Sequence, residues 1–348
     1  MHYDGFATKA GYPRRHMKIR PYSWLLVVAI ILGLGGELFA RYFLGLGHPP
    51  LSQAHPTIEY LFKPNQDVRR FGNHFSTNRY GMRSADFPPQ KQTPTELRIM
   101  VYGDSVVNGG NLTDQSRLAT SLLQNRLTND LHRPVIVGNI SAGSWGPPNE
   151  LAYLRQYGFL DADIAVLVLS SSDYDDAPTF EPLDPMTHPT QAPVSALWEG
   201  ITRYLPRYLN GRVINEAGTV PVTHVPNKTD MEVSLGAERE FLQSARGRGV
   251  RILLVQHWTA SELKSGQPLE GHAMIRDVAT SESVPVADDV DPLRARIASG
   301  QNPYRDDIHV NETGQSVLEQ LLLEQLNQHF SEILQPQQPR VAEQRPAT

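Results

Sequence analysis

Residues 97–106 read LRIMVYGDSV, an apolar run that stops at a Gly-Asp-Ser turn. A short run of branched and aromatic side chains such as 97–102 is typical of a strand buried in a sheet. Gly103 ends this run, and Ser105 follows in a tight turn with its hydroxyl above the sheet edge. The stretch therefore predicts a strand that delivers a serine to the end of a sheet.

The rest of the chain repeats this alternation of strand and helix. Further apolar runs suited to strands buried on both faces lie at 134–140, 162–169 and 250–256. Helical spacing of apolar residues is found at 117–131, 150–157, 235–246 and 316–330. Strands that alternate with helices predict an α/β fold whose parallel sheet is covered on both faces. Residues 174–230 interrupt the rhythm and are interpreted as an insertion that forms a cap or rim.

Residues that can carry chemistry follow the ends of the predicted strands. Residues 139–144 read NISAGS, residues 170–173 read SSSD, and residues 306–309 read DDIH just before the last helix. Because the carboxyl ends of parallel strands meet at one edge of a sheet, we expect these segments to lie near Ser105. Each motif is weak alone, since a Gly-Asp-Ser turn is usually an ordinary turn. Their order along the chain is specific.

This ordered set resembles the SGNH (GDSL-like) hydrolase superfamily over residues 78–330. The resemblance implies a flavodoxin-like, three-layer α/β/α fold with a central parallel sheet. It also implies a catalytic triad of Ser105 as nucleophile, His309 as base and Asp306 as the acid that orients it. The backbone N–H groups of Ser105 and Gly143 would hold the oxyanion.

One position departs from the family pattern. The family usually has Asn-Asp after the third strand, where this chain has Ser172-Asp173. The hydroxyl of Ser172 can donate as the third member of the oxyanion hole, but it is short and rotates freely. Loss of one oxyanion donor typically costs about 10²–10³ in turnover. Reduced or lost catalysis therefore stays open.

The residue types define a reaction class. A serine hydroxyl is a poor nucleophile until a base such as His309 takes its proton, and Asp306 fixes the imidazole tautomer. The acyl-enzyme then has two fates: water makes the protein an esterase or deacetylase, and a sugar hydroxyl makes it an O-acetyltransferase. A third alternative is a non-catalytic accessory protein that binds polysaccharide. We expect the esterase.

An apolar segment at residues 23–47 contains only two charges, Glu37 and Arg41, which can pair four residues apart on one helix face. About 20 apolar residues are needed to cross a bilayer. No convincing cleavage site follows, which favours an uncleaved transmembrane anchor over a signal peptide. Basic residues precede the segment, namely Lys9, Arg14, Arg15, Lys18 and Arg20. The positive-inside rule then places residues 1–22 in the cytoplasm and the remainder in the bacterial periplasm.

The anchor strengthens the resemblance to bacterial members associated with exopolysaccharides such as cellulose. The resemblance implies an O-acylated (acetylated) polysaccharide as substrate, the inner membrane as a partner, and an exopolysaccharide synthesis or export complex as a further one. We interpret residues 48–95 as a linker and lead-in, 96–330 as the hydrolase-like domain, and 331–348 as a disordered tail.

Composition excludes several other classes. Lys plus Arg number 32 against 37 for Asp plus Glu, a net charge of −5 that disfavours nucleic acid as a partner. The chain has no cysteine, which excludes thiolate catalysis and Cys-ligated metals. The twelve His residues show no metal-binding spacing, so we expect neither metal nor cofactor. His257 and the acidic loop at 173–176 are interpreted as structural.

The insertion carries an amphipathic segment at residues 194–209. Its aromatic side chains Trp198, Tyr204 and Tyr208 are interpreted as packing within the cap. Stacking on sugar rings and contact with the membrane surface remain as alternatives.

Overall fold

The computed structural model describes residues 22–205 and 226–335. The segments expected to form the cytoplasmic N-terminus (1–21), the middle of the insertion (206–225, with Tyr208) and most of the tail (336–348) lie outside the described residues.

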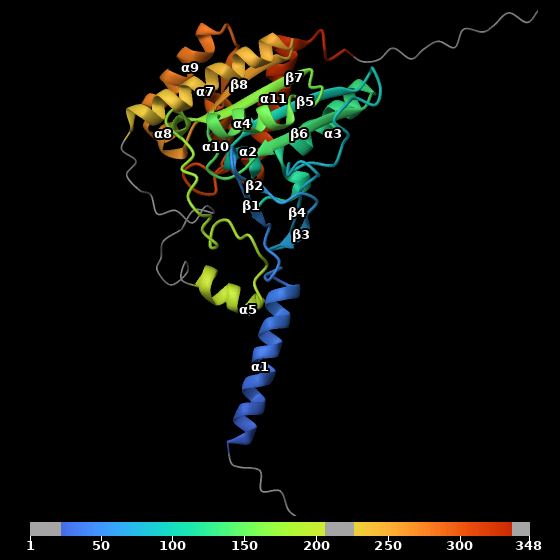
Figure 1. The fold of residues 1–348 in the computed structure, drawn as a ribbon, viewed down its shortest axis with the longest axis vertical. Helices are drawn as coiled ribbons and strands as arrows, with labels where there is room; N and C mark the ends of the chain where they lie inside the picture. Colours follow the sequence, from blue (N-terminus) through green and yellow to red (C-terminus); the bar gives the residue numbers. More distant parts are fainter. Residues whose placement is uncertain (1–21, 206–225, 336–348) are drawn as a thin grey trace, which may run out of the picture.

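A five-stranded parallel sheet forms the centre of the fold (Figure 1). Its strands are β5 (Leu97–Gly103), β6 (Val135–Ser141), β7 (Ile164–Ser170), β8 (Arg251–His257) and β9 (Val286–Asp288). The spatial order is β6-β5-β7-β8-β9, which in chain order is the flavodoxin-like sequence of strands. In this topology the strand order reverses beside β5, so a crevice opens where β5 ends. The prediction of a parallel α/β fold is confirmed.

Helices cover both faces of the sheet. One face carries α4 (Pro147–Tyr157), α7 (Lys228–Gly247) and α9 (Glu270–Ser281), and the other carries α3 (Ala119–Leu131) and α11 (Glu312–Phe330). Alternate residues of β5 divide between the two cores: Met100 and Tyr102 point to the first, Ile99 and Val101 to the second. Each of the seven residues of β7 is buried, because both faces of this strand are covered.

Short helices surround the carboxyl end of the sheet. They are α2 (Ser105–Asn108), η1 (Gln115–Arg117), η2 (Ser171–Tyr174), α8 (Ala260–Ser265) and α10 (Val290–Ala298). A small third core joins Val106 of α2 to Leu293 of α10 and Val310 in the loop before α11. This core fixes the segment after β5 against the segment before α11.

Residues 48–95 are not a linker, which corrects the sequence interpretation. They contain two antiparallel hairpins, β1 (Ser52–His55) with β2 (Glu59–Phe62) and β3 (Asp67–Arg70) with β4 (Asn73–Ser76). Ile58, Tyr60 and Phe75 are buried against the domain. Strands of four residues are too short to show a period in sequence, which is why the pattern was missed.

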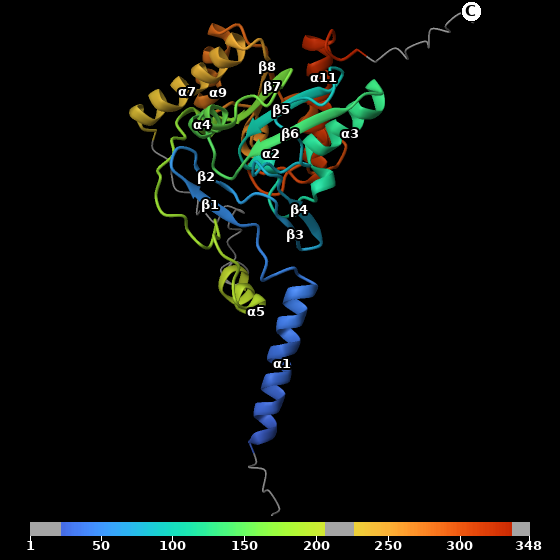
Figure 2. The ribbon, with the colours of Figure 1, turned by 45° about the vertical axis from the view of Figure 1, so that its right-hand side comes forward.

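Helix α1 (Ser23–Tyr42) extends away from the domain, and a helical segment of the insertion lies beside its domain end in both views (Figures 1 and 2). That segment joins α5 (Ala196–Glu199) to the π-helical turn η3 (Gly200–Tyr204). Among the described residues, α1 alone is long and apolar enough to cross a membrane. The expected ion pair within it is present, with Arg41 Nη2 2.6 Å from Glu37 Oε1.

Candidate active site

The turn after β5 positions the serine. Ser105 is the first residue of α2, and the carboxylate of Asp104 caps the helix by accepting from the Val106 N–H at 2.8 Å. A Cβ at position 103 would lie 2.9 Å from the Val168 carbonyl oxygen, so the turn requires Gly103. Backbone N–H groups in the first turn of a helix have no intrahelical acceptor, which leaves that of Ser105 available to an oxyanion.

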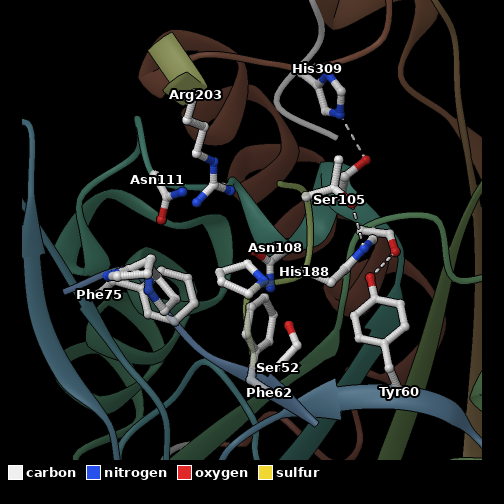
Figure 3. Close-up of a pocket in the computed structure, with 16 residues that line it drawn as sticks. Ser52, Tyr60, Phe62, Phe75, Ser105, Asn108, Asn111, His188, Arg203 and His309 are labelled. Carbon is white, nitrogen blue, oxygen red and sulfur yellow. Dashed lines mark hydrogen bonds between the residues drawn. The ribbon is translucent and has the colours of Figure 1, made fainter. Parts of the chain in front are cut away.

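The three predicted triad residues come together at this turn (Figure 3). His309 Nε2 lies 2.9 Å from Ser105 Oγ, and His309 Nδ1 lies 2.8 Å from Asp306 Oδ2. The backbone N–H of His309 also donates to Asp306 Oδ1 at 2.8 Å, so the acid and the base are fixed to each other within one turn of chain. The geometry is that of a serine nucleophile with its base and orienting acid.

Electrostatics keep the orienting acid ionised. Burial opposes charge on Asp306, but the hydrogen bonds from the side chain and backbone of His309 outweigh it and lower the pKa of Asp306. An ionised Asp306 accepts from His309 Nδ1, which leaves Nε2 of the neutral imidazole to accept the proton of Ser105.

A cavity of about 80 Å³ opens over Ser105, His309 and Gly143. Figure 3 shows His309 and Arg203 on one side of this cavity, with Tyr60, Phe62 and Phe75 on the other. Its remaining lining residues come from the start of the hairpin region, from the end of α2 and the loop after it, and from the insertion: Pro49, Pro50, Ser52, Asn108, Gly110, Asn111, Thr187, His188 and Pro189. The insertion therefore borders the cavity.

The two other predicted oxyanion residues differ in placement. Gly143 lines the cavity, and its carbonyl accepts a short hydrogen bond from the Tyr60 hydroxyl, which fixes the orientation of the following peptide. Ser172 does not line the cavity. Its side chain is exposed on η2, and its hydroxyl lies 3.0 Å from that of Ser170.

Sequence reasoning missed the wall opposite the triad. Tyr60 and Phe62 come from β2. The ring of His188 packs edge-on against that of Tyr60, with the two ring centroids 4.3 Å apart. Asn108, one turn after Ser105, also lines the cavity and donates to the Ser141 carbonyl at 3.2 Å. The one sequence signal that could have indicated Asn108 as a cavity residue is its position three residues after Ser105 in a short helix.

A second His–Asp pair lies just behind the triad. His257, the last residue of β8, is buried, with Nδ1 2.5 Å from Asp289 Oδ2 and Nε2 2.8 Å from the carbonyl oxygen of Ile308. Ile308 directly precedes the base His309. His257 is thus hydrogen-bonded to the loop that carries His309, and it does not line the cavity.

Several buried carboxyl groups lie near the same edge. Burial raises the pKa of Asp104, and it raises those of Asp173 and Glu150 strongly. Burial also raises the pKa of Glu238 to about 9. In each case the main cause is desolvation, which disfavours the charged form of the carboxyl group. No cluster of His, Asp or Glu side chains within residues 22–205 and 226–335 is arranged to hold a metal ion.

Comparison with known proteins gives structural likenesses only. No protein-family model matches the chain, and no curated protein matches it. A two-domain esterase active on acetylated mannans superposes with a TM-score of 0.44 and 14% identity, covering 70% of this chain and 52% of the esterase. This chain thus spans about half the length of that protein.

Two further solved structures are similar over their nearly complete lengths. A lipase/acylhydrolase from Enterococcus faecalis has a TM-score of 0.40 and 14% identity, covering 70% of this chain and 100% of its own. A mutant acetyl-xylooligosaccharide esterase from Geobacillus stearmophilus has a TM-score of 0.41 and 11% identity, covering 66% and 93%.

Proposed function

We propose that this protein is a membrane-anchored, periplasmic serine esterase that removes O-acetyl groups from an exopolysaccharide. The observation that carries the proposal is the unbroken hydrogen-bonded series Ser105–His309–Asp306 at the floor of a cavity. A serine in an ordinary turn has no need of a buried imidazole and a carboxylate aligned behind its hydroxyl.

The reaction follows from the positions of the donors and acceptors. Ser105 Oγ attacks the ester carbonyl carbon while its proton passes to His309 Nε2, and the negative charge moves to the carbonyl oxygen. The N–H groups of Ser105 and Gly143 then hold that oxygen. His309 returns the proton to the departing sugar oxygen, which leaves an acetyl-serine. Water, deprotonated by His309, releases acetate and restores the serine.

The size of the cavity favours a short acyl group. An apolar cavity of about 150 Å³ is enough to hold a benzene molecule, and this one has about half that volume. A cavity of this size is sufficient for an acetyl group above Ser105. Arg203, Asn108 and Asn111 border the same cavity and supply polar groups suited to sugar hydroxyls.

The anchor supports the location. Helix α1 spans 20 residues, about 30 Å at 1.5 Å per residue, which matches the hydrocarbon core of a bilayer. The basic residues that precede it favour a cytoplasmic N-terminus and therefore a periplasmic domain.

The test is release of acetate from acetylated cello-oligosaccharides by the full chain in detergent, with Ser105→Ala as the matched control. We expect release by the wild type alone. Transfer of acetyl from the donor to a sugar acceptor in excess of free acetate would replace the esterase by an acetyltransferase. Binding of the oligosaccharide with equal, background release from both proteins would replace it by an accessory role.

A further inference from the structure

The charges near the end of the anchor are covered by the insertion. The carboxylate of Glu37 accepts hydrogen bonds from Ser195 Oγ at 2.8 Å, from the Ala196 N–H at 3.0 Å and from the Leu197 N–H at 2.9 Å. The same carboxylate pairs with Arg41. Because Glu37 lies five residues before the last residue of α1, the first turn of α5 must lie at the depth of the last turns of that helix.

The opposite side of this short helical segment is apolar and exposed. Its outward residues are Val194, Trp198, Ile201 and Leu205, with exposed fractions of 101%, 63%, 44% and 45%. Trp198, Ile201 and Leu205 are spaced three and four residues apart along the helical segment, and Val194 precedes its N-cap Ser195. We call these four residues the outer face. The expectation that Trp198 packs within the cap does not hold, because this side chain is exposed.

The charged residues of the segment point the other way. Glu199 is buried, accepts from the Gly47 N–H at 2.6 Å and pairs with Arg70 at 2.7 Å. Arg203 is also buried and lines the cavity over Ser105. The segment thus presents charge to the domain and apolar side chains outward.

We propose that the outer face lies in the interfacial layer of the bilayer that α1 spans, and that it holds the active-site cavity at the membrane surface. The occupant is lipid because the segment that carries the outer face packs against α1, whose last residue Tyr42 and C-cap Phe43 are exposed by 77% and 74%. Tryptophan and other aromatic side chains favour this layer, and an amphipathic helix with one apolar face binds there.

This placement has a consequence for the substrate. Arg203 leaves the inner side of the segment to line the cavity, and Pro49 and Pro50, which follow the anchor closely, line it too. The cavity therefore lies on the side of the domain toward α1. Resting on the proposed function, we infer that the esterase acts on polysaccharide at the membrane surface rather than on polymer away from the cell.

The absence of cysteine makes the test direct, since one introduced cysteine is unique in the chain. Ile201→Cys and Ile297→Cys would each carry an environment-sensitive nitrobenzoxadiazole label, in the full chain reconstituted in phosphatidylethanolamine/phosphatidylglycerol nanodiscs. Ile297 is a matched control because it is the same residue type with 46% exposure, and its helix α10 lies away from α1 and α5 in Figure 1.

Lipids with a spin label high on the acyl chain should quench the label at position 201 several-fold more than the label at position 297. Equal, weak quenching at both positions would overturn the proposal. Hydrolysis of 4-nitrophenyl acetate by the same labelled samples separates the two claims. Quenching without hydrolysis would reject the esterase and keep the membrane contact; hydrolysis without quenching would do the reverse.

Discussion

Two His–Asp pairs lie at the same edge of the sheet, and they differ in the group that faces the second ring nitrogen. In each pair an imidazole Nδ1 faces a carboxylate, at 2.8 Å for His309–Asp306 and 2.5 Å for His257–Asp289. The partner of the second ring nitrogen differs: a hydroxyl for His309 and a backbone carbonyl for His257.

The group that faces the second ring nitrogen decides whether the imidazole is charged. A carbonyl only accepts, so both ring nitrogens of His257 donate and the ring is an imidazolium. Burial opposes this charge, but the neighbouring carboxylate of Asp289 outweighs it and raises the pKa of His257 to about 9. The hydroxyl of Ser105 can donate, so His309 is able to stay neutral and accept. His257 is thus a buried cation, whereas His309 can act as the base that we propose.

The largest effect on activity is expected from a change at Ser105, whose hydroxyl faces the His309–Asp306 pair. Ser105→Ala should lower hydrolysis of 4-nitrophenyl acetate by at least about 10⁴-fold, because no nucleophile remains above the cavity. The melting temperature should hardly change, since the substitution removes one oxygen from a cavity wall. Retained hydrolysis with an intact fold would mean that another group attacks the ester.

The next test of the comparison is to replace the carboxylate of each pair, Asp306 and Asp289, by an amide. Asp306→Asn should lower kcat by about 10⁴-fold at nearly unchanged stability, because the amide no longer holds the tautomer in which His309 Nε2 accepts. Enzyme assays and thermal unfolding of the same samples would show this separation. A mutant that keeps most of its activity would show that Asp306 does not orient the base.

Asp289→Asn should act mainly on stability. It leaves the buried imidazolium of His257 without its counter-charge, and breaking a buried ion pair costs about 3–5 kcal/mol in the free energy of unfolding. Denaturant unfolding near pH 7 measures this. A loss confined to kcat, with unchanged unfolding, would assign the second pair to the reaction itself.

The pH dependence of stability should distinguish His257. Because its folded pKa is raised from 6.5 to about 9, its contribution to stability is fully present below pH 6.5 and is lost as the pH rises through 9. His257→Gln removes this titration while the amide can still donate to the Ile308 carbonyl. The melting temperature of the wild type should therefore fall more steeply from pH 6.5 to 9.5 than that of the mutant; parallel curves would show an uncharged His257.

The smallest effect is expected at the position where the family motif departs. Ser172→Ala should change kcat/KM by less than about threefold, because the side chain is exposed and does not line the cavity. Asn108→Ala is the comparison, since Asn108 lines the cavity and supports Ser141. A loss of about 10² in kcat/KM on Ser172→Ala would instead show that the Ser172 hydroxyl acts in the oxyanion hole.

The features that could be predicted from the sequence are those that depend on residues close together in the chain. The sheet and its covering helices follow from runs of apolar residues, and Ser105, Asp306 and His309 each occur in a motif at an element boundary. The wall formed by Tyr60 and Phe62 did not follow, because those residues lie in four-residue strands whose burial depends on contacts with distant segments.

The His257–Asp289 pair could not be predicted from local sequence patterns either. His257 and Asp289 are 32 residues apart, and their contact depends on the parallel register of β8 with β9. Ser172 shows the opposite failure. Its place in a motif suggested a role in the site, whereas the turn of η2 leaves its side chain exposed.

The most direct test of the central claim is the pH–rate profile of 4-nitrophenyl acetate hydrolysis by the wild type and by His309→Ala. The wild-type rate should rise with pH as His309 loses its proton, and the mutant should show neither the rise nor activity above background. A flat wild-type profile, or hydrolysis that survives His309→Ala, would contradict the assignment of His309 as the base that activates Ser105.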